Sequence, residues 1–202
     1  MTAPQQIIYV VDDDEAMRDS MTWLLEGEGY KVACFDSAAA FLGAWRSSLR
    51  GCIVLDVRMP EMSGLELQEK LDSIGSHLPI IFVTGHGDVP MAVGALQRGA
   101  CDFIEKPFHN EDLLARIERA LELDSQIAAR QQRDNAIASR LDQLTQRERE
   151  VMQLVVAGKL NKQIADEFDI SMKTVEARRA RVMEKMGVRT LAELVKIVMS
   201  VN

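Results

Sequence analysis

Val10-Val11-Asp12-Asp13-Asp14, near the start of this 202-residue chain, is the end of an apolar run followed by three acidic residues. Two later apolar runs end in a similar way, with Asp56 after Cys52 to Leu55 and with Lys106-Pro107 after Cys101 to Glu105. Each run is short, rich in aliphatic or β-branched residues and bounded by polar or Gly-containing segments, which predicts buried β-strands. Acidic groups and one lysine therefore stand at strand ends.

The apolar runs alternate with amphipathic stretches that are long enough to form helices. We expect strands at Ile7 to Val11, Cys52 to Leu55, Ile80 to Thr84 and Cys101 to Glu105, and helices at Asp14 to Glu28, Gly64 to Ser73, Asp88 to Arg98 and Glu111 to Leu123. This alternation predicts βαβ units and a parallel sheet with helices on both faces. Ligands of such sheets bind at the carboxyl ends of the strands, so Asp12, Asp13 and Asp56 are expected to converge.

Converging carboxylates repel one another unless one takes up a proton or a cation binds them. Oxygen ligands favour Mg²⁺ or Ca²⁺ over softer metals, and the sequence has neither an EF-hand spacing nor a Cys/His cluster. We predict Mg²⁺, which keeps several waters and accepts phosphate oxygens. With Lys106 as an added positive charge, such a site suits phosphoryl transfer, with Asp56 as the nucleophile that forms an aspartyl phosphate.

Composition predicts a cytoplasmic protein of two domains. A chain of 202 residues with 47% hydrophobic content can form two cores. No apolar stretch reaches the roughly 18 residues of a membrane span, and no signal-peptide pattern opens the chain. The three cysteines, Cys34, Cys52 and Cys101, have no metal-like spacing and fall on or beside predicted strands, so we expect buried, reduced thiols.

Charge is distributed unevenly along the chain. The net charge is −7 overall, but it is −11 for residues 1–124 and +3 for residues 145–202. The basic excess therefore belongs to the C-terminal part, which is the part compatible with an acidic polymer such as DNA.

The segment 124–141 is polar and lacks Pro and Gly, which predicts a helical spacer. One form of this prediction makes the spacer continuous with the helix that precedes it. Leu114, Leu121 and Ala128 are spaced by seven residues, a pattern typical of a coiled-coil seam, but polar residues follow and break it. Dimerisation through this segment stays open.

Four short helices are predicted after the spacer. Thr145 and Glu148 have the capping-box spacing at the start of the first, which is expected to end near Gly158. The second covers Asn161 to Phe168, Ser171 caps the third, and Thr190 begins the fourth, whose inward residues are expected to be Leu191, Leu194, Val195 and Val198. Two short helices joined by a tight turn, the second of them basic and exposed, indicate a helix-turn-helix.

The first part of the chain resembles the receiver domain of bacterial two-component response regulators. The segments that carry the resemblance are Val10 to Asp14, Leu55 to Pro60 with Met62-Ser63-Gly64, Val83 to Ala92, Gly99-Ala100 and Asp102 to Phe108. The resemblance implies that Asp56 is the phosphoacceptor, that Asp13 binds Mg²⁺ directly, that Asp12 acts mainly through water, and that the carbonyl of Arg58 is a metal ligand. It also implies that Thr84 and Lys106 meet the phosphoryl group, that Phe103 follows as a switch, and that Lys106-Pro107 is cis.

The C-terminal part resembles the NarL/LuxR helix-turn-helix module, and the whole chain resembles its FixJ-type members. Motifs such as Thr174-Val175-Glu176 and Val182 to Met186 carry this resemblance and place the recognition helix at Met172 to Met186. It implies base contacts by Glu176, Ala177 and Ala180, and phosphate contacts by Lys162, Lys173, Thr174, Arg178 and Arg181. Ala177-Arg178 stands where relatives commonly carry Val-His, and an arginine can also bind guanine bidentately, so the base contacts stay open.

Together these features predict a doubly wound, five-stranded parallel sheet of the flavodoxin-like receiver type, followed by an all-α, four-helix helix-turn-helix domain. The expected boundaries are 1–123 for the receiver, 124–141 for the helical linker and 142–202 for the DNA-binding domain. The expected function is that of a transcription factor that a sensor histidine kinase activates by phosphorylating Asp56. The resemblance implies that phosphorylation promotes a homodimer on double-stranded promoter DNA, and RNA polymerase is a further expected partner.

Two alternatives belong to other classes. A phosphatase with an aspartate nucleophile would carry an Asp-x-Asp arrangement, whereas Val57-Arg58 follows Asp56 here, so we do not expect an enzyme that turns over external phosphoesters. The other alternative is a DNA-binding dimer whose receiver is never phosphorylated.

Overall fold

The computed structural model describes residues 5–85, 94, 96–97 and 99–199, and the chain divides into two compact units, Met1–Ala128 and Ala129–Asn202. The predicted helix Asp88 to Arg98 lies largely outside the described residues, as does the motif from His86 to Ala92. Among the described residues, no helix is both long and apolar enough to span a membrane.

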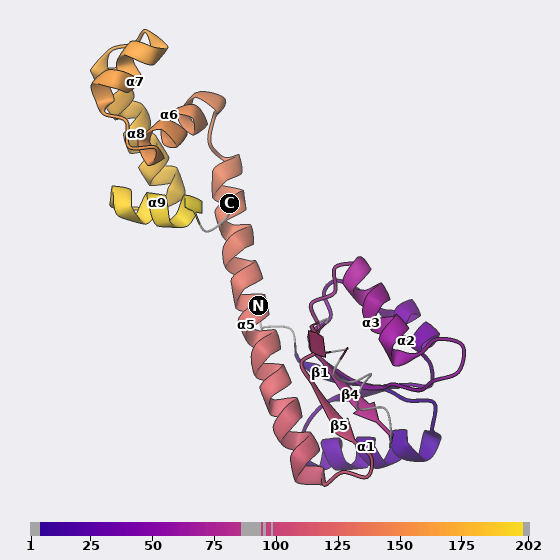
Figure 1. Ribbon diagram of the computed structural model, residues 1–202. Coiled ribbons are helices and arrows are strands. Elements are labelled where there is room, and N and C mark those ends of the chain that lie inside the picture. The colour runs from indigo at the N-terminus through magenta and orange to yellow at the C-terminus, as the bar shows by residue number, and fades with distance from the viewer. Residues whose placement is uncertain (1–4, 86–93, 95, 98, 200–202) are drawn as a thin grey trace. The chain divides into compact units, whose positions relative to one another are not determined.

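The first unit is built on a parallel sheet with the strand order β2-β1-β3-β4-β5 (Figure 1). Its strands are β1 Ile7–Val11, β2 Val32–Phe35, β3 Gly51–Asp56, β4 Ile80–Thr84 and β5 Asp102–Glu105. The predicted five-stranded parallel sheet is confirmed, and the four strands located from the sequence lie within a residue of their expected positions. The sequence did not locate β2, because this edge strand is only four residues long and none of its side chains is fully buried.

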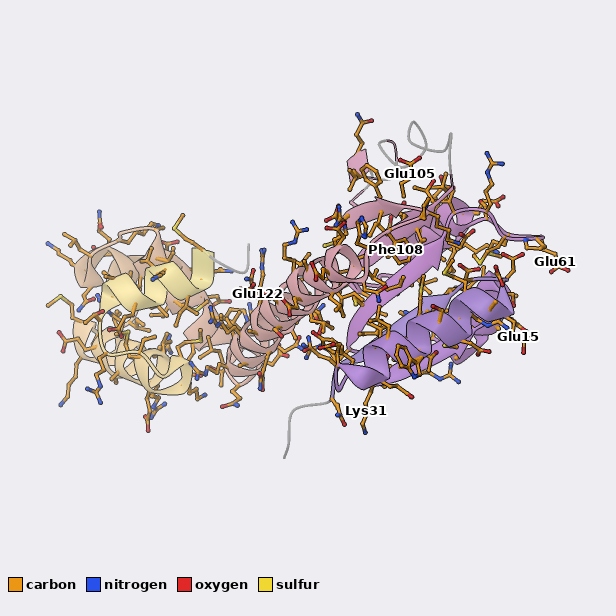
Figure 2. The ribbon with its side chains drawn as sticks, turned by 90° about the horizontal axis from the view of Figure 1, so that it is seen from below. Glu15, Lys31, Glu61, Glu105, Phe108 and Glu122 are labelled. Atoms are coloured by element: carbon orange, nitrogen blue, oxygen red, sulfur yellow. The ribbon has the colours of Figure 1, made fainter. Side chains whose placement is uncertain are left out.

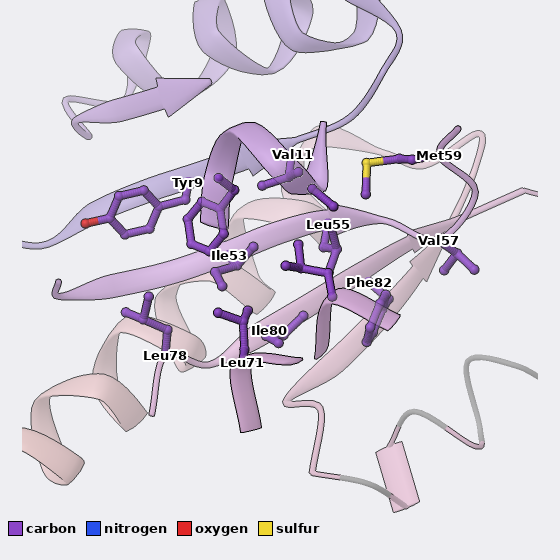
Figure 3. Packing of buried hydrophobic residues seen from close by; sticks show 13 residues of the cluster. Tyr9, Val11, Ile53, Leu55, Val57, Met59, Leu71, Leu78, Ile80 and Phe82 are labelled. Atoms are coloured by element: carbon purple, nitrogen blue, oxygen red, sulfur yellow. The ribbon is translucent and has the colours of Figure 1, made fainter. Parts of the chain in front are cut away.

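Helices cover both faces of the sheet. On one face, α2 (Ala38–Ala44) and α3 (Gly64–Ser73) pack over alternate residues of the central strands, a cluster shown in Figure 3. On the other face, α1 (Glu15–Gly27) and the first part of α5 (Asn110–Asp142) contribute Met21, Leu25, Leu113 and Ile117. Because β3 is buried on both faces, its sequence is continuously apolar rather than alternating.

Local hydrogen bonds define where the helices of the first unit begin. The Asp14 carboxylate accepts a hydrogen bond from the amide of Ala16 (2.9 Å) and caps α1. Ser63 and Glu66 form a reciprocal capping box at the start of α3. Each cap fixes the start of a helix that follows a strand at this edge of the sheet.

The helix α5 is one continuous helix of 33 residues, as Figure 1 shows, and it extends through the predicted spacer. Two members of the heptad pattern, Leu114 and Leu121, pack against the core of the first unit. That use accounts for their spacing without a second chain, and dimerisation through this helix stays a prediction.

The expectation of three buried thiols is wrong for Cys34, which is exposed, whereas Cys52 is buried and Cys101 is half-buried. Cys34 lies on β2 at the edge of the sheet, where one side of the strand faces solvent. Burial raises the pKa of the Cys52 thiol, which keeps it protonated and unreactive.

The second unit is a bundle of short helices, α6 Gln146–Val156, α7 Asn161–Phe168, α8 Met172–Met186 and α9 Leu191–Met199, joined to the end of α5. Its core contains Val151, Ile164, Val175, Val182 and Leu194. The prediction that Leu191 faces inward is wrong, since this side chain is 41% exposed. Leu194, Ile197 and Val198 pack against the core, whereas Leu191 is the first residue of α9, one turn before Leu194, and stays exposed.

A capping box and an ion pair meet at Glu148 in α6. The Glu148 carboxylate accepts hydrogen bonds from the Thr145 amide (2.9 Å) and from the Lys185 ammonium group (2.6 Å), and the side chain is buried. The pKa of Glu148 is lowered, mainly by the hydrogen bond from Lys185 and next by that from Thr145. The carboxylate therefore stabilises the fold above the pKa of an unfolded glutamate, about 4.3, and this contribution is lost as the pH falls through the lower folded value.

We expect Glu148→Gln to lower the free energy of unfolding of the second unit by about 1–2 kcal/mol at pH 7, since it removes a charge-assisted hydrogen bond. The difference from wild type should shrink below about pH 4.5, where the unfolded carboxyl becomes protonated. Both tryptophans, Trp23 and Trp45, lie in the first unit. Urea unfolding followed by circular dichroism should therefore shift while tryptophan fluorescence stays unchanged; equal shifts in both signals would contradict this assignment.

Candidate functional site

Four strand ends meet at one edge of the sheet. Asp12 follows β1, Asp56 ends β3, Thr84 ends β4 and Lys106 follows β5. The parallel register pairs Val11 with Leu55 across β1 and β3, and Asp56 with Val83 across β3 and β4, so these ends lie side by side. Figure 2 marks this edge with Glu15 and Glu61, and Lys31 lies at the opposite edge. The expected convergence therefore follows from the strand order.

The Lys106 ammonium group lies between two carboxylates. Its Nζ donates hydrogen bonds to Asp56 Oδ1 (2.7 Å) and to Asp12 Oδ2 (2.9 Å), and both carboxylates are buried. Asp13 is exposed beside them. An open pocket of about 280 Å³ is lined by Asp12, Asp13, Asp14, Asp56, Arg58, Gly85 and Lys106. A small anion could enter there and reach both Asp56 and Lys106.

Backbone groups hold the acidic side chains in place. The amide of Arg58 donates to Asp56 Oδ2 (2.6 Å), and the amide of Asp14 donates to Asp12 Oδ1 (2.9 Å). Lys106 is fixed by its own amide, which donates to the carbonyl of Thr84 (2.7 Å). The predicted cis peptide bond between Lys106 and Pro107 is present. Hydrogen bonds from the backbone thus orient these side chains.

One supporting residue escaped the sequence analysis. The guanidinium group of Arg18 on α1 donates to the carbonyl oxygens of Asp12 (2.8 Å) and Asp13 (3.0 Å) and holds the acidic loop against the helix. The only signal for this role is a basic residue one turn into a helix that follows the acidic run. That signal is weak, because an arginine at the surface of a helix is usually solvated.

Electrostatics at the site favour a protonated Lys106. Burial lowers the pKa of Lys106, but hydrogen bonds from it to Asp56 and Asp12, and their charges, outweigh burial and raise the pKa. Burial is the largest influence on Asp56 and raises the pKa of its carboxyl, with a further rise from Asp12; Lys106 and the Arg58 amide oppose both. Lys106 therefore keeps a positive charge beside the carboxylates at neutral pH.

The two predicted switch residues, Thr84 and Phe103, do not line the pocket and make no direct hydrogen bond to Asp56. Thr84 is fully buried, and its hydroxyl group donates to the carbonyl of Gly85 (3.2 Å). Phe103 on β5 is half-buried and packs against the core on the α2 and α3 face. Their roles as switches stay predictions.

The donor atoms at the site suit a hard divalent cation, since they are carboxylate and carbonyl oxygens. The arrangement is not that of a preformed metal centre, because no three His, Cys, Asp or Glu side chains in the described part of the chain are grouped to hold a metal ion. The Lys106 ammonium group explains this, because it forms ion pairs with carboxylate oxygens of Asp12 and Asp56. The residue types fit Mg²⁺, and the side chains would have to rearrange around it.

In the second unit, most of the residues predicted to contact DNA lie at the surface. Lys162, Lys173, Glu176, Ala177, Ala180 and Arg181 are exposed, and Thr174 and Arg178 are half-buried. The Thr174 hydroxyl shares a hydrogen bond with that of Ser171 (2.8 Å), the residue that caps α8. Arg179, the neighbour of Arg178, instead hydrogen-bonds Asn161 at the start of α7. This bond joins the two helices and helps to fix the angle between them.

Comparisons with known proteins agree with the fold. Residues 8–118 match the family described as "Response regulator receiver domain", and residues 142–198 match "Bacterial regulatory proteins, luxR family". The chain therefore belongs to the two-component response regulators that join a receiver to a LuxR-type DNA-binding domain, and it regulates transcription.

Named relatives place the chain more narrowly within that family. The transcriptional regulatory protein FixJ of Bradyrhizobium diazoefficiens is 48% identical over 192 residues, covering 95% of this chain and 94% of FixJ. The response regulator protein TmoT of Ectopseudomonas mendocina is 46% identical, covering 98% of this chain and 90% of TmoT. Among solved structures, the response regulator StyR matches with a TM-score of 0.87 at 42% identity, covering 97% of this chain and 99% of StyR. Full-length FixJ from B. japonicum matches with a TM-score of 0.61 at 47% identity, covering 97% of both chains. The predicted FixJ-type resemblance is confirmed.

Membership in a family of transcription regulators, rather than of enzymes that turn over external substrates, weighs against the phosphatase alternative.

Proposed function

We propose that Asp56 accepts a phosphoryl group from the phosphohistidine of a sensor kinase and thereby controls DNA binding by the second unit. The observation that carries this proposal is the Lys106 ammonium group, which lies 2.7 Å from Asp56 Oδ1 inside a pocket open to a small anion. A carboxylate with a fixed cation beside it is suited to accept a dianionic group, because the cation offsets the negative charge that arrives.

In the proposed transfer, an Asp56 carboxylate oxygen attacks the phosphorus atom and forms a P–O bond. The P–N bond to the histidine breaks, and the ring nitrogen keeps its electron pair. The Arg58 amide and Lys106 orient the Asp56 carboxylate during this step. Mg²⁺, when held by Asp12, Asp13, Asp56 and the Arg58 carbonyl, would offset charge on the phosphoryl oxygens. The same residues would assist hydrolysis of the aspartyl phosphate, and no other catalysis is proposed.

The phosphoryl group adds a charge of about −1.5 to −2 beside buried groups that now balance one another. Lys106 would then pair with a phosphoryl oxygen. The Thr84 hydroxyl, which donates only to the carbonyl of Gly85 here, would turn toward another phosphoryl oxygen, and the half-buried Phe103 would move into the space it leaves. These movements would change the receiver face that we propose for a homodimer. That face is built around β5, residues 111–123 of α5 and the predicted helix near 88–98, which lies largely outside the described residues.

For DNA recognition we propose that α8 enters the major groove with Glu176, Ala177 and Ala180 near base edges. Lys162, Lys173, Thr174, Arg178 and Arg181 would hold phosphates, and the exposure of most of these side chains supports the proposal. We keep the proposed boundaries of 1–123 for the receiver, 124–141 for the linker and 142–202 for the DNA-binding domain. RNA polymerase as a partner, and a cytoplasmic location, stay predictions.

DNA affinity tests the proposal as a whole. DNA sites would first be selected from a random-sequence duplex library with phosphodonor-treated protein. The selected sites would then be titrated with wild type and with Asp56→Asn, each with and without phosphodonor treatment. We expect treatment to tighten binding by wild type at least about tenfold, since a dimer on half-sites one helical turn apart gains a second set of contacts, and to leave Asp56→Asn unchanged. Equal affinity of the treated and untreated wild type would favour a DNA-binding dimer whose receiver works without phosphorylation.

A further inference from the structure

The helix α5 changes its surroundings at Asp124. Up to this residue it is held by the sheet through Leu113, Ile117 and Ala120, which are buried. Asp124 is the last buried residue of α5, and no side chain from 125 to 136 is buried. Packing begins again at Ile137 and Leu141, which are half-buried against the core of the second unit. Of the side chains between these points, Ser125 accepts a hydrogen bond from the Gln6 amide (3.2 Å), Ile127, Ala128 and Asp134 are half-buried, and the others are exposed.

Asp124 is held by an unusually complete set of partners. The Arg50 guanidinium group donates from Nε to Asp124 Oδ1 (3.0 Å) and from Nη2 to Oδ2 (2.8 Å) and to the main-chain carbonyl (3.3 Å). The Gln6 amide adds hydrogen bonds to Asp124 Oδ2 (2.7 Å) and to the carbonyl of Leu121 (2.7 Å). We call Arg50, Asp124 and Gln6 the clasp. Paired, two-pronged contacts of this kind fix direction as well as distance.

The clasp is anchored in rigid backbone. The carbonyl of Arg50 accepts hydrogen bonds from the Ile7 amide (3.0 Å) and from the Tyr9 hydroxyl group (3.3 Å), so Arg50 belongs to the edge where β1 and β3 begin. This is the edge opposite the Asp56 pocket, and Figure 2 shows Glu122 on the side of the unit marked by Lys31, away from Glu15 and Glu61. The end of the supported part of α5 is therefore tied directly to the sheet.

The segment 125–136 is short, polar and mostly exposed. Residues 125–136 contain no Gly or Pro. They hold an ion pair between Arg130 and Asp134 (3.9 Å), which is exposed and therefore contributes little to the stability of the helix. An isolated helix shorter than about 12–15 residues is marginal in water. Its helical state must therefore depend on the structured residues at its two ends.

We propose that the clasp is a conformational control point that decides whether residues 125–136 form a rigid helix or a flexible tether. As a helix, these twelve residues span about 18 Å in a fixed direction. As an extended chain they reach up to about 40 Å with no fixed direction. Opening the clasp removes the tertiary contact that holds the first turn of the segment, so the loss of helix starts there. The inference does not depend on phosphorylation of Asp56.

Hydrogen exchange measured by mass spectrometry on the full-length protein tests this inference. For Asp124→Asn, which keeps the shape of the side chain and removes its charge, we expect amides 125–136 to exchange at least about tenfold faster, while amides 113–120 and those of β1 and β3 stay protected. Arg50→Lys keeps the charge and loses the two-pronged geometry, so it should give an intermediate increase. Arg130→Gln removes only the exposed pair and serves as the matched control, with a change below about twofold.

Two results would overturn the proposal. One is unchanged exchange of residues 125–136 in both Asp124→Asn and Arg50→Lys, which would show that the helix needs no clasp. The other is an equal acceleration of residues 113–120 and 125–136, which would show that the clasp stabilises the receiver as a whole. Fluorescence of Trp23 and Trp45 reports whether each variant still folds; if Asp124→Asn does not, the comparison rests on Arg50→Lys, whose charge is retained.

Discussion

An Asp56→Asn variant is expected to take up no phosphoryl group under conditions in which the wild type takes up one. Wild type incubated with Mg²⁺ and a small-molecule phosphodonor should gain the mass of a single phosphoryl group, as measured on the intact protein. Asparagine is nearly isosteric with aspartate but presents an amide, which is a much weaker nucleophile than a carboxylate. The expected effect is therefore complete loss rather than a reduced rate.

The structure explains why this loss should be confined to the chemistry. In the variant, Lys106 still has its ion pair with Asp12 at 2.9 Å, and the Arg58 amide can still donate to the oxygen of an asparagine side chain. Asp19→Asn is a suitable control, because Asp19 is an exposed carboxylate on α1, outside the pocket, and this variant should gain the same adduct as wild type. An adduct that persists on Asp56→Asn would move the phosphoacceptor to another residue. The absence of any adduct on wild type would leave the kinase as the only effective donor and weaken the proposal.

The second large effect is expected from Gly64→Ala. A Cβ atom at position 64 would lie 2.2 Å from the carbonyl oxygen of Asp56 and 3.1 Å from the Leu55 side chain. The amide of Gly64 also donates to the carbonyl of Val57 (3.0 Å), so the start of α3 cannot move away without breaking this bond. The substitution must therefore displace the backbone that carries Asp56. We expect a loss of about 3 kcal/mol or more in the free energy of unfolding of the receiver, which is large for one methyl group.

Gly43→Ala provides the matched control. A Cβ atom at position 43 has nothing within 4 Å, and Gly43 lies inside α2. Alanine is favoured over glycine within a helix, so this variant should gain about 0.5–1 kcal/mol. Urea unfolding followed by tryptophan fluorescence measures both variants, since both tryptophans lie in the first unit. A Gly64→Ala variant with wild-type stability and wild-type phosphorylation would show that the two chain segments can separate at little cost.

Features that depend on near neighbours in the chain could be predicted from the sequence. The Thr145 and Glu148 capping box needs only residues three positions apart, and the structure has it. The positions of β1, β4, α3 and α7 agree with the predicted ranges, because the spacing of apolar residues distinguishes strands from helices. The range of α8 agrees with the one that the family resemblance implied. The convergence of Asp12, Asp56 and Lys106 was also predictable, since parallel strands place their carboxyl ends at one edge.

The order of the elements, their helix caps and the residue types at the strand ends follow from short-range periodicity and hydrogen bonding, so they could be inferred from the chain alone. The position of one ammonium group between carboxylates 94 and 50 residues away depends instead on the folded arrangement. The tertiary structure also exposes Cys34 at the sheet edge and Leu191 outside the core of the second unit, and it ties α5 to the sheet through Arg50 and Asp124. These contacts join residues far apart in the chain, and they depend on how the sheet and helices pack together, which no local pattern encodes.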